Sequence, residues 1–129
     1  MGDPDLEARI FTAVTGIAGE EIDRYAERIA NLQRAILVRE GRKLPEADFP
    51  PEFNFIEPLP GGPRGQPVMV PGPGETAVDV TGRTLDRGKF ISMLKEYYRL
   101  RGWDETTGLP RPETLAALGL DDLSPLAIS

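Results

Sequence analysis

The sequence contains no cysteine and no histidine among its 129 residues. Without cysteine, the chain can form no disulfide, no thiolate metal site and no thiolate nucleophile. Without histidine, it lacks the side chain best suited to acid–base catalysis near neutral pH, which is also a common ligand of zinc and copper. Metal binding by side chains would therefore depend on oxygen ligands.

Basic residues are outnumbered, because 15 Lys and Arg stand against 21 Asp and Glu and give a net charge of −6. Affinity for nucleic acids comes mostly from Lys and Arg, and no basic stripe is present, so no nucleic-acid partner is expected. No apolar run reaches the roughly 18 to 20 residues of a membrane helix. The start of the chain also lacks the basic and apolar segments of a signal peptide. We therefore expect a soluble cytoplasmic protein with no membrane partner.

Proline and glycine are abundant and unevenly placed. Of the 13 prolines, nine lie between residues 44 and 84, together with six of the 14 glycines. Helix is excluded over most of that segment because proline removes a backbone donor and clashes with the preceding turn. The sequence predicts one helical domain over 1–129, in which a helical block at 1–43 and another at 85–129 are joined by an irregular strap at 44–84.

The expected fold class is mainly α, with about four helices near 5–15, 20–40, 86–101 and 112–118, and a long Pro/Gly-rich crossover. In the second helix, large apolar residues recur at steps of three and four and predict one buried seam. The seam consists of Ile22, Tyr25, Ile29, Leu32 and Ile36. The third helix has only one polar stripe, so we expect it to need neighbours on several sides. This predicts self-association, a tight partner subunit or a loosely packed domain.

The strap carries more large apolar groups than a solvated linker needs. We expect these side chains to anchor it on the helices, and they are Phe49, Phe53, Phe55, Ile56 and Leu59. Further along, Val68 and Val70 alternate opposite Val78 and Val80, which permits a short β-hairpin with a glycine-rich tip.

Three features of the sequence invite a functional interpretation that we judge weaker than the structural one. The adjacent carboxylates of Glu20–Glu21 and Asp121–Asp122 could hold a hard cation, but no further oxygen ligands follow at loop spacing. The glycine-rich segments at 60–65 and 71–76 fit neither the dinucleotide-binding nor the P-loop pattern, so turns are favoured. The proline motifs could dock a polyproline-reading module, although their interleaved phenylalanines favour packing on the parent fold.

The densest aromatic cluster lies at the end of the third predicted helix, and its members are Tyr97, Tyr98, Arg101 and Trp103. These residues could line a substrate channel, form an interface or stack on a ligand, while core packing at the helix end is the alternative. No catalytic, cofactor-binding or metal-binding residue is identified. The residues by themselves thus indicate a helix-rich interaction or structural module.

The stretch from Leu85 to Leu123 resembles the C-terminal end of the tungsten-containing aldehyde ferredoxin oxidoreductase family, which includes benzoyl-CoA reductase catalytic subunits. The resemblance is strongest over Tyr97–Tyr98, the run at 100–104 and the segment 115–120. Two further stretches agree in the same order: "TAVTG" with "ERIANLQRAILVREG", and "LPEADFPPEFNFIEPLPGGPRGQ". Together they cover nearly the whole chain.

The resemblance implies an enzyme in which tungsten on two pterins and a [4Fe–4S] cluster oxidise an aldehyde and pass electrons to ferredoxin. The cluster cysteines, pterin-binding motifs and N-terminal β domain of that family have no counterpart in this sequence. We therefore expect a C-terminal domain, fragment or subunit that completes the packing and the substrate channel, binds no cofactor and is inactive by itself. Its expected partner is the upstream catalytic portion, or a second copy. The alternative is a non-catalytic helical scaffold.

Overall fold

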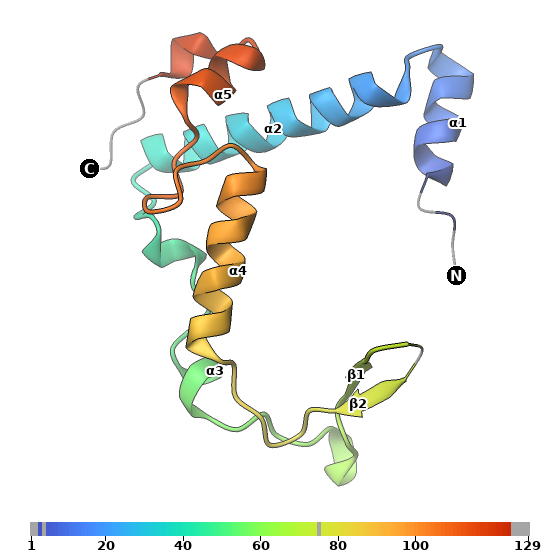
Figure 1. Cartoon of the computed structure of the whole chain (residues 1–129), viewed down its shortest axis with the longest axis vertical. Coiled ribbons are helices and arrows are strands. Elements are labelled where there is room, and N and C mark those ends of the chain that lie inside the picture. Colours follow the sequence, from blue (N-terminus) through green and yellow to red (C-terminus); the bar gives the residue numbers. More distant parts are fainter. Residues whose placement is uncertain (1–2, 4, 75, 125–129) are drawn as a thin grey trace. The chain divides into compact units, whose positions relative to one another are not determined.

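The computed structural model describes residues 3, 5–74 and 76–124, and in this part of the chain the fold is mainly helical (Figure 1), as predicted. The helices are α1 (Leu6–Thr15), α2 (Gly19–Arg39), α3 (Phe53–Ile56), α4 (Arg87–Leu100) and α5 (Pro112–Ala117). Short 3-10 turns are η1 (Glu46–Asp48), η2 (Pro63–Gly65) and η3 (Asp121–Leu123), and the strands are β1 (Met69–Pro71) and β2 (Ala77–Asp79). The four predicted helices are confirmed as α1, α2, α4 and α5, whereas α3 was not predicted. Over the described residues, no helix combines the length and the apolar character needed to cross a bilayer.

The chain divides into two compact units, which we describe separately. The helical unit comprises Met1–Ala47 and Tyr97–Ser129, and the hairpin unit comprises Asp48–Glu96. The residues of α4 are shared between them, with 87–96 in the hairpin unit and 97–100 in the helical unit. The sequence-based prediction of a single domain over 1–129 stays a prediction.

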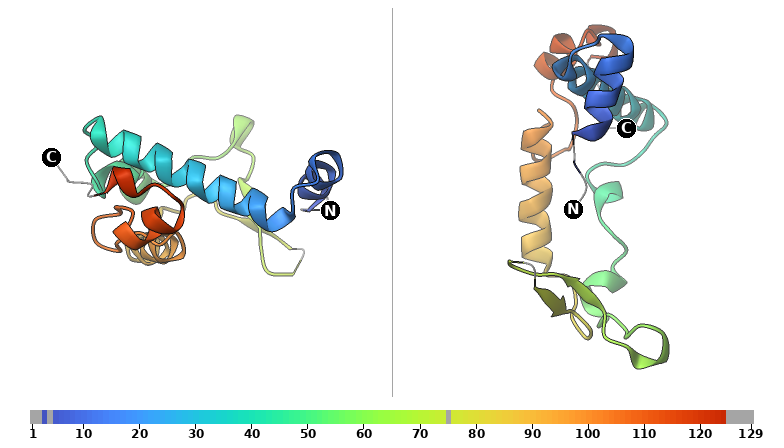
Figure 2. Two further views of the ribbon diagram at one scale, coloured as in Figure 1. Left: turned by 90° about the horizontal axis from the view of Figure 1, so that it is seen from above. Right: turned by 90° about the vertical axis from the view of Figure 1, so that its right-hand side faces the viewer.

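The apolar core of the helical unit forms where α5 and η3 lie against the C-terminal half of α2 (Figure 2). Ala35 of α2 is fully buried there, and the other members of the cluster come from the C-terminal segment: Leu115, Leu120 and Leu123. At its other end α2 contacts α1, which buries none of its own residues.

The prediction of which face of α2 is buried was wrong. The buried residues are Asn31, Arg34, Ala35 and Val38. Of the predicted seam, Tyr25, Ile29, Leu32 and Ile36 are exposed, and Ile22 is half-buried. The reason is that the unit supplies hydrogen-bond acceptors and donors to Asn31 and Arg34, which offsets the cost of burying these polar groups.

In the hairpin unit, the predicted hairpin is confirmed. Strands β1 and β2 pair in antiparallel register with Val70 opposite Val78. The pairing extends by one hydrogen bond, because the Val80 amide donates to the Val68 carbonyl at 2.9 Å. Glu75, which follows β1 and precedes β2 in the sequence, lies outside the described residues.

The predicted anchoring of the strap is correct for two of its five side chains. The rings of Phe49 and Phe55 contact Phe90 of α4, with centroids 5.3 and 5.7 Å apart. Phe53, Ile56 and Leu59 remain exposed, so their anchoring role was wrong. Since α3 is only four residues long, it offers little surface for burial on both of its sides.

Asp86 caps the start of α4, because its carboxylate accepts a hydrogen bond from the Lys89 amide at 2.9 Å. Neighbours on several sides of α4 were expected, but Tyr98 is its one buried residue among those described. Met93 and Leu100 are among its most exposed apolar side chains.

Candidate functional site

The last turn of α4 and the residues after it form an aromatic cluster in the helical unit. The ring centroids of Tyr97 and Trp103 are 5.6 Å apart, and those of Tyr98 and Trp103 are 5.9 Å apart. Gly102 turns the chain between them, with a φ of +66°, and the Trp103 amide then donates to the Tyr98 carbonyl at 2.8 Å. A Cβ at Gly102 would lie 2.4 Å from Oγ1 of Thr114, so this turn requires glycine.

A buried arginine from α2 completes the cluster. The Arg34 guanidinium carbon lies 4.4 Å from the Trp103 ring centroid and 5.7 Å from that of Tyr98. Its Nε and Nη2 atoms both donate to the Gly108 carbonyl oxygen, at 3.1 and 3.0 Å. Stacking on aromatic faces and a carbonyl acceptor provide favourable interactions for a charge removed from water.

Asn31, one turn before Arg34, is fully buried and holds the tryptophan by its indole. The Trp103 Nε1–H donates to Asn31 Oδ1 at 2.8 Å, while Asn31 Nδ2 donates to the Glu27 carbonyl at 2.9 Å. Both polar ends of this amide therefore have partners. The bond fixes the amide orientation, because the indole can act only as a donor.

The loop that follows Trp103 is organised by Asp104. Its Oδ1 accepts hydrogen bonds from the Thr107 and Thr106 amides and from the Thr107 hydroxyl, at 2.8, 3.0 and 2.9 Å. These bonds, with the Thr107 amide contributing most, hold the pKa of the Asp104 carboxyl below its ordinary range. The same loop closes through the Gly108 amide, which donates to the Asp104 carbonyl and places Gly108 beside Arg34.

The accessible side of the cluster consists of Tyr97 and Arg101. Tyr97 is 42% exposed, and the Arg101 guanidinium carbon lies 5.3 Å from its ring centroid. Arg101 also forms an ion pair with Glu27 of α2. Because both partners of this pair are partly solvated, its contribution to stability is small.

The structure thus brings the four sequence-predicted residues together but divides them by burial. Tyr98 and Trp103 are 1% and 4% exposed, as packing residues are, whereas Tyr97 and Arg101 reach the surface. Sequence reasoning missed Asn31, Arg34 and Gly108. Their only signal was the spacing of Asn31 and Arg34 on one side of α2, which a polarity pattern assigns to solvent.

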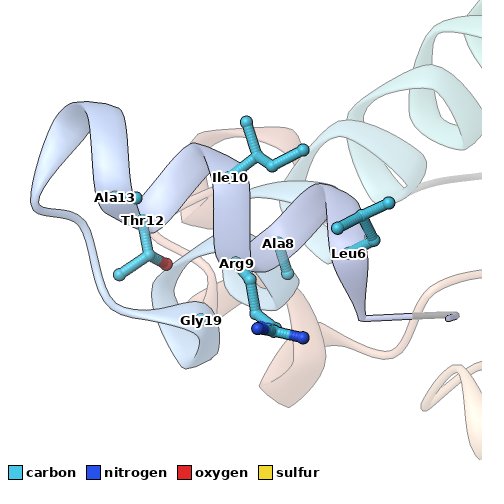
Figure 3. Close-up of a pocket in the computed structure, with 7 residues that line it drawn as sticks. All are labelled: Leu6, Ala8, Arg9, Ile10, Thr12, Ala13 and Gly19. Atoms are coloured by element: carbon cyan, nitrogen blue, oxygen red, sulfur yellow. The ribbon is translucent and has the colours of Figure 1, made fainter.

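Hollows are also present away from the aromatic cluster in the described part of the chain. In the hairpin unit, a pocket of about 530 Å³ has mostly apolar walls, including Phe53, Leu59, Val80 and Leu85. Its walls are tied together by backbone hydrogen bonds from Leu59 to Arg83 and from Leu85 to Asn54. In the helical unit, an open hollow of about 680 Å³ is lined by α1 residues and by Gly19 at the start of α2 (Figure 3).

The other sequence candidates provide no organised site. Glu20, Glu21, Asp121 and Asp122 are exposed, and the described residues contain no group of three or more carboxylates positioned to hold a metal ion. Both glycine-rich segments close into turns: the Gly62 amide donates to the Gln66 carbonyl, and the Gly72 amide donates to the Thr76 carbonyl.

The donor set of the chain does not fit the metal centre that the sequence resemblance implies. An iron–sulfur cluster is held mainly by cysteine thiolates, with histidine in some cases, and the sequence contains neither residue. No residue of this chain can therefore ligate such a cluster through a thiolate or an imidazole.

Comparison with known protein families gives one assignment that spans both units. The family described as aldehyde ferredoxin oxidoreductase, domains 2 and 3, matches residues 1–120. The matched segment includes the complete aromatic cluster, the α2 residues beneath it and the hairpin unit. The chain therefore belongs to the aldehyde ferredoxin oxidoreductase family, as part of its domains 2 and 3.

Proposed function

We propose that this chain is a packing and substrate-channel part of a tungstopterin aldehyde:ferredoxin oxidoreductase-like enzyme, and that it does not carry the redox site. The family match over residues 1–120 is the observation that carries the proposal. The absence of cysteine supports the proposal that this chain does not carry the redox site. Oxygen donors are a poor substitute for the thiolates of tungsten–pterin and iron–sulfur centres. Tungsten and iron would accordingly be bound through residues of another part of the enzyme.

The exposed apolar surface supports a role alongside other domains or subunits. Several large apolar side chains are at least half exposed in the described part of the chain: Ile10, Val14, Ile29, Phe53, Ile56, Met69, Met93 and Leu100. Apolar exposure on this scale is typical of surfaces that a partner covers. The family description, which numbers these domains 2 and 3, agrees with a larger enzyme.

Within the aromatic cluster, we assign different roles to the buried and the exposed members. Tyr98 and Trp103 hold the end of α4 against α2 and act through packing. Tyr97 and Arg101 provide the accessible aromatic and cationic groups that can form a channel wall or an interface. Tyr97 is the better probe of function, because its truncation removes surface rather than core.

The proposal is tested by aldehyde-dependent reduction of a viologen dye. The purified chain should be inactive, and activity should appear when it is co-expressed with the product of a neighbouring open reading frame that carries the cluster cysteines. In that complex, Tyr97→Ala should lower activity or assembly, whereas Lys95→Ala, at an exposed polar position on the same helix, should not. Activity of the purified chain would contradict the proposal.

A second candidate function is a non-catalytic helical scaffold. It is favoured by the absence of cysteine and histidine, together with the firmly hydrogen-bonded cluster around Arg34. The viologen assay distinguishes the two functions. A scaffold would bind its partner without changing the rate of aldehyde oxidation in any complex.

A further inference from the structure

Burial is divided unequally between the two units of the chain. Among the described residues, every buried residue belongs to the helical unit, including Ala35, Tyr98, Trp103 and Leu115. The described residues of the hairpin unit are half-buried at most. Because burial of apolar surface supplies most of the free energy that offsets the loss of chain entropy, the hairpin unit is the less stable of the two.

Two segments of the hairpin unit, 49–59 and 82–90, are held to each other by aromatic contacts. Phe90, at the start of α4, contacts the rings of both Phe49 and Phe55. All three rings are half-buried rather than buried. Phe90 is therefore the one ring that takes part in both of these contacts.

Backbone hydrogen bonds join the same two segments. The Leu85 amide donates to the Asn54 carbonyl at 2.9 Å, and the Leu59 amide donates to the Arg83 carbonyl at 2.8 Å. The Gly82 amide donates to the Leu59 carbonyl at 2.9 Å. These bonds close the loop that contains β1 and β2, so separation of the two segments also releases the hairpin.

The other interactions of the hairpin unit add little stability. The side chains of the Arg87–Glu52 ion pair are 44% and 66% exposed, and such surface pairs contribute little. A two-stranded hairpin alone is marginally stable in water, and residues 87–96 of α4 form too short a helix to be stable in isolation. Each element of the unit therefore depends on the contact between the two segments.

We propose that the hairpin unit opens as one cooperative unit while the helical unit stays folded, and that α4 is the joint between the open and the folded parts. In the open state, α4 unwinds from Arg87 as far as Glu96. Its C-terminal end stays in place, because Tyr98 is 1% exposed and its carbonyl accepts the Trp103 amide at 2.8 Å. Such local opening below the free energy of global unfolding is typical of units with few buried contacts.

Opening also removes the pocket of the hairpin unit. Its walls come from both segments, with Phe53 and Leu59 from the first and Arg83 and Leu85 from the second. A molecule that occupies this pocket binds the closed state alone and shifts the population towards it. The opening does not depend on the proposed enzymatic role.

The first test is hydrogen exchange of the purified full chain in native buffer, measured by mass spectrometry of its peptides. The amides of Leu59, Gly82 and Leu85 should exchange together, roughly tenfold or more faster than those of Trp103 and Leu120 in the helical unit. Along α4, protection should rise at residue 101, whose amide donates to the carbonyl of residue 97. Equal protection in the two units would overturn the proposal, because the chain would then open only as a whole.

The second test uses Phe90→Ala, which removes both aromatic contacts. The Leu59, Gly82 and Leu85 amides should all exchange roughly tenfold or more faster than in the parent, while exchange in the helical unit stays unchanged. Lys95→Ala, at an exposed position in the same unit, is the matched control and should change neither. Faster exchange confined to the neighbourhood of residue 90, or an equal acceleration in the helical unit, would contradict the cooperative opening of the hairpin unit.

Discussion

The guanidinium of Arg34 donates two hydrogen bonds to the carbonyl oxygen of Gly108, a residue 74 positions further along the chain. Arg34 is 7% exposed, and the same guanidinium stacks on Trp103. This relationship joins the C-terminal half of α2 to the loop after α4. Substitution of either Arg34 or Gly108 therefore tests how much this contact stabilises the aromatic cluster.

Replacement of the arginine should destabilise the helical unit. Arg34→Lys retains the charge but loses the two-pronged donor and the planar stacking surface. We expect the free energy of unfolding to fall by about 1.5–3 kcal/mol, the range for hydrogen bonds to charged groups. Denaturant unfolding measures this change, and Arg24→Lys on the exposed side of the same helix should stay within about 0.5 kcal/mol of the parent.

Replacement of Gly108 should lower the free energy of unfolding by more than its positive φ alone predicts. Gly108 has a φ of +70°, and an added Cβ would lie 2.6 Å from Nη2 of Arg34 and 2.8 Å from Cζ of Tyr98. Gly119 has a similar φ of +65° but has no atom within 4 Å of an added Cβ. Gly108→Ala should therefore cost about 1–3 kcal/mol more than Gly119→Ala in the same unfolding assay. If Gly108→Ala and Gly119→Ala lose the same free energy of unfolding, the prediction that Arg34 and Tyr98 crowd the Gly108 site is wrong.

The bond between Asn31 and Trp103 should show strong energetic coupling. Asn31→Leu leaves the buried indole N–H without its acceptor, which costs about 1–3 kcal/mol. In the Trp103→Phe background the donor is absent, so the same substitution should cost less, and a double-mutant cycle measures the difference. Trp103 is the only tryptophan in the chain, so its fluorescence reports the loss of the native environment in Asn31→Leu. Additive effects would contradict the coupling.

The Asp104 loop should make stability depend on acid pH. Because the native pKa of Asp104 is lowered, the unfolded state takes up its proton first as the pH falls. The stabilisation is present above the ordinary aspartate pKa of about 4 and is lost as the pH falls through the lower native value. Asp104→Asn should thus be less stable than the parent at pH 7, and the gap should narrow below about pH 4. Asp23→Asn, at an exposed site on α2, controls for the removal of one negative charge. If the difference in unfolding free energy between the parent and Asp104→Asn does not change with pH, the predicted role of the Asp104 carboxylate is wrong.

The helices were predictable because their signals are local. Proline confined the long helices to the two blocks, and the observed bounds of α1, α2, α4 and α5 agree with the predicted ranges to within about one residue. The hairpin followed from alternation of valines on two short segments. Each of these predictions depended on neighbours in sequence.

The burial of α2 was not predictable by the same means. A polarity pattern assigns Asn31 and Arg34 to solvent and Ile29 to the core, whereas the structure does the opposite. The decisive partners, the Trp103 indole and the Gly108 carbonyl, come from the distant C-terminal block. The aromatic cluster was therefore visible in the sequence as a group of residues, but the polar groups beneath it were not.

The central claim, that this family member carries no redox centre of its own, is tested most directly by the metal content of the purified chain. The protein should be produced with tungstate and iron supplied, and then analysed for both metals and for aldehyde-dependent viologen reduction. The account predicts neither tungsten nor iron in stoichiometric amount and no dye reduction. Stoichiometric tungsten or iron together with aldehyde oxidation by the chain alone would contradict it.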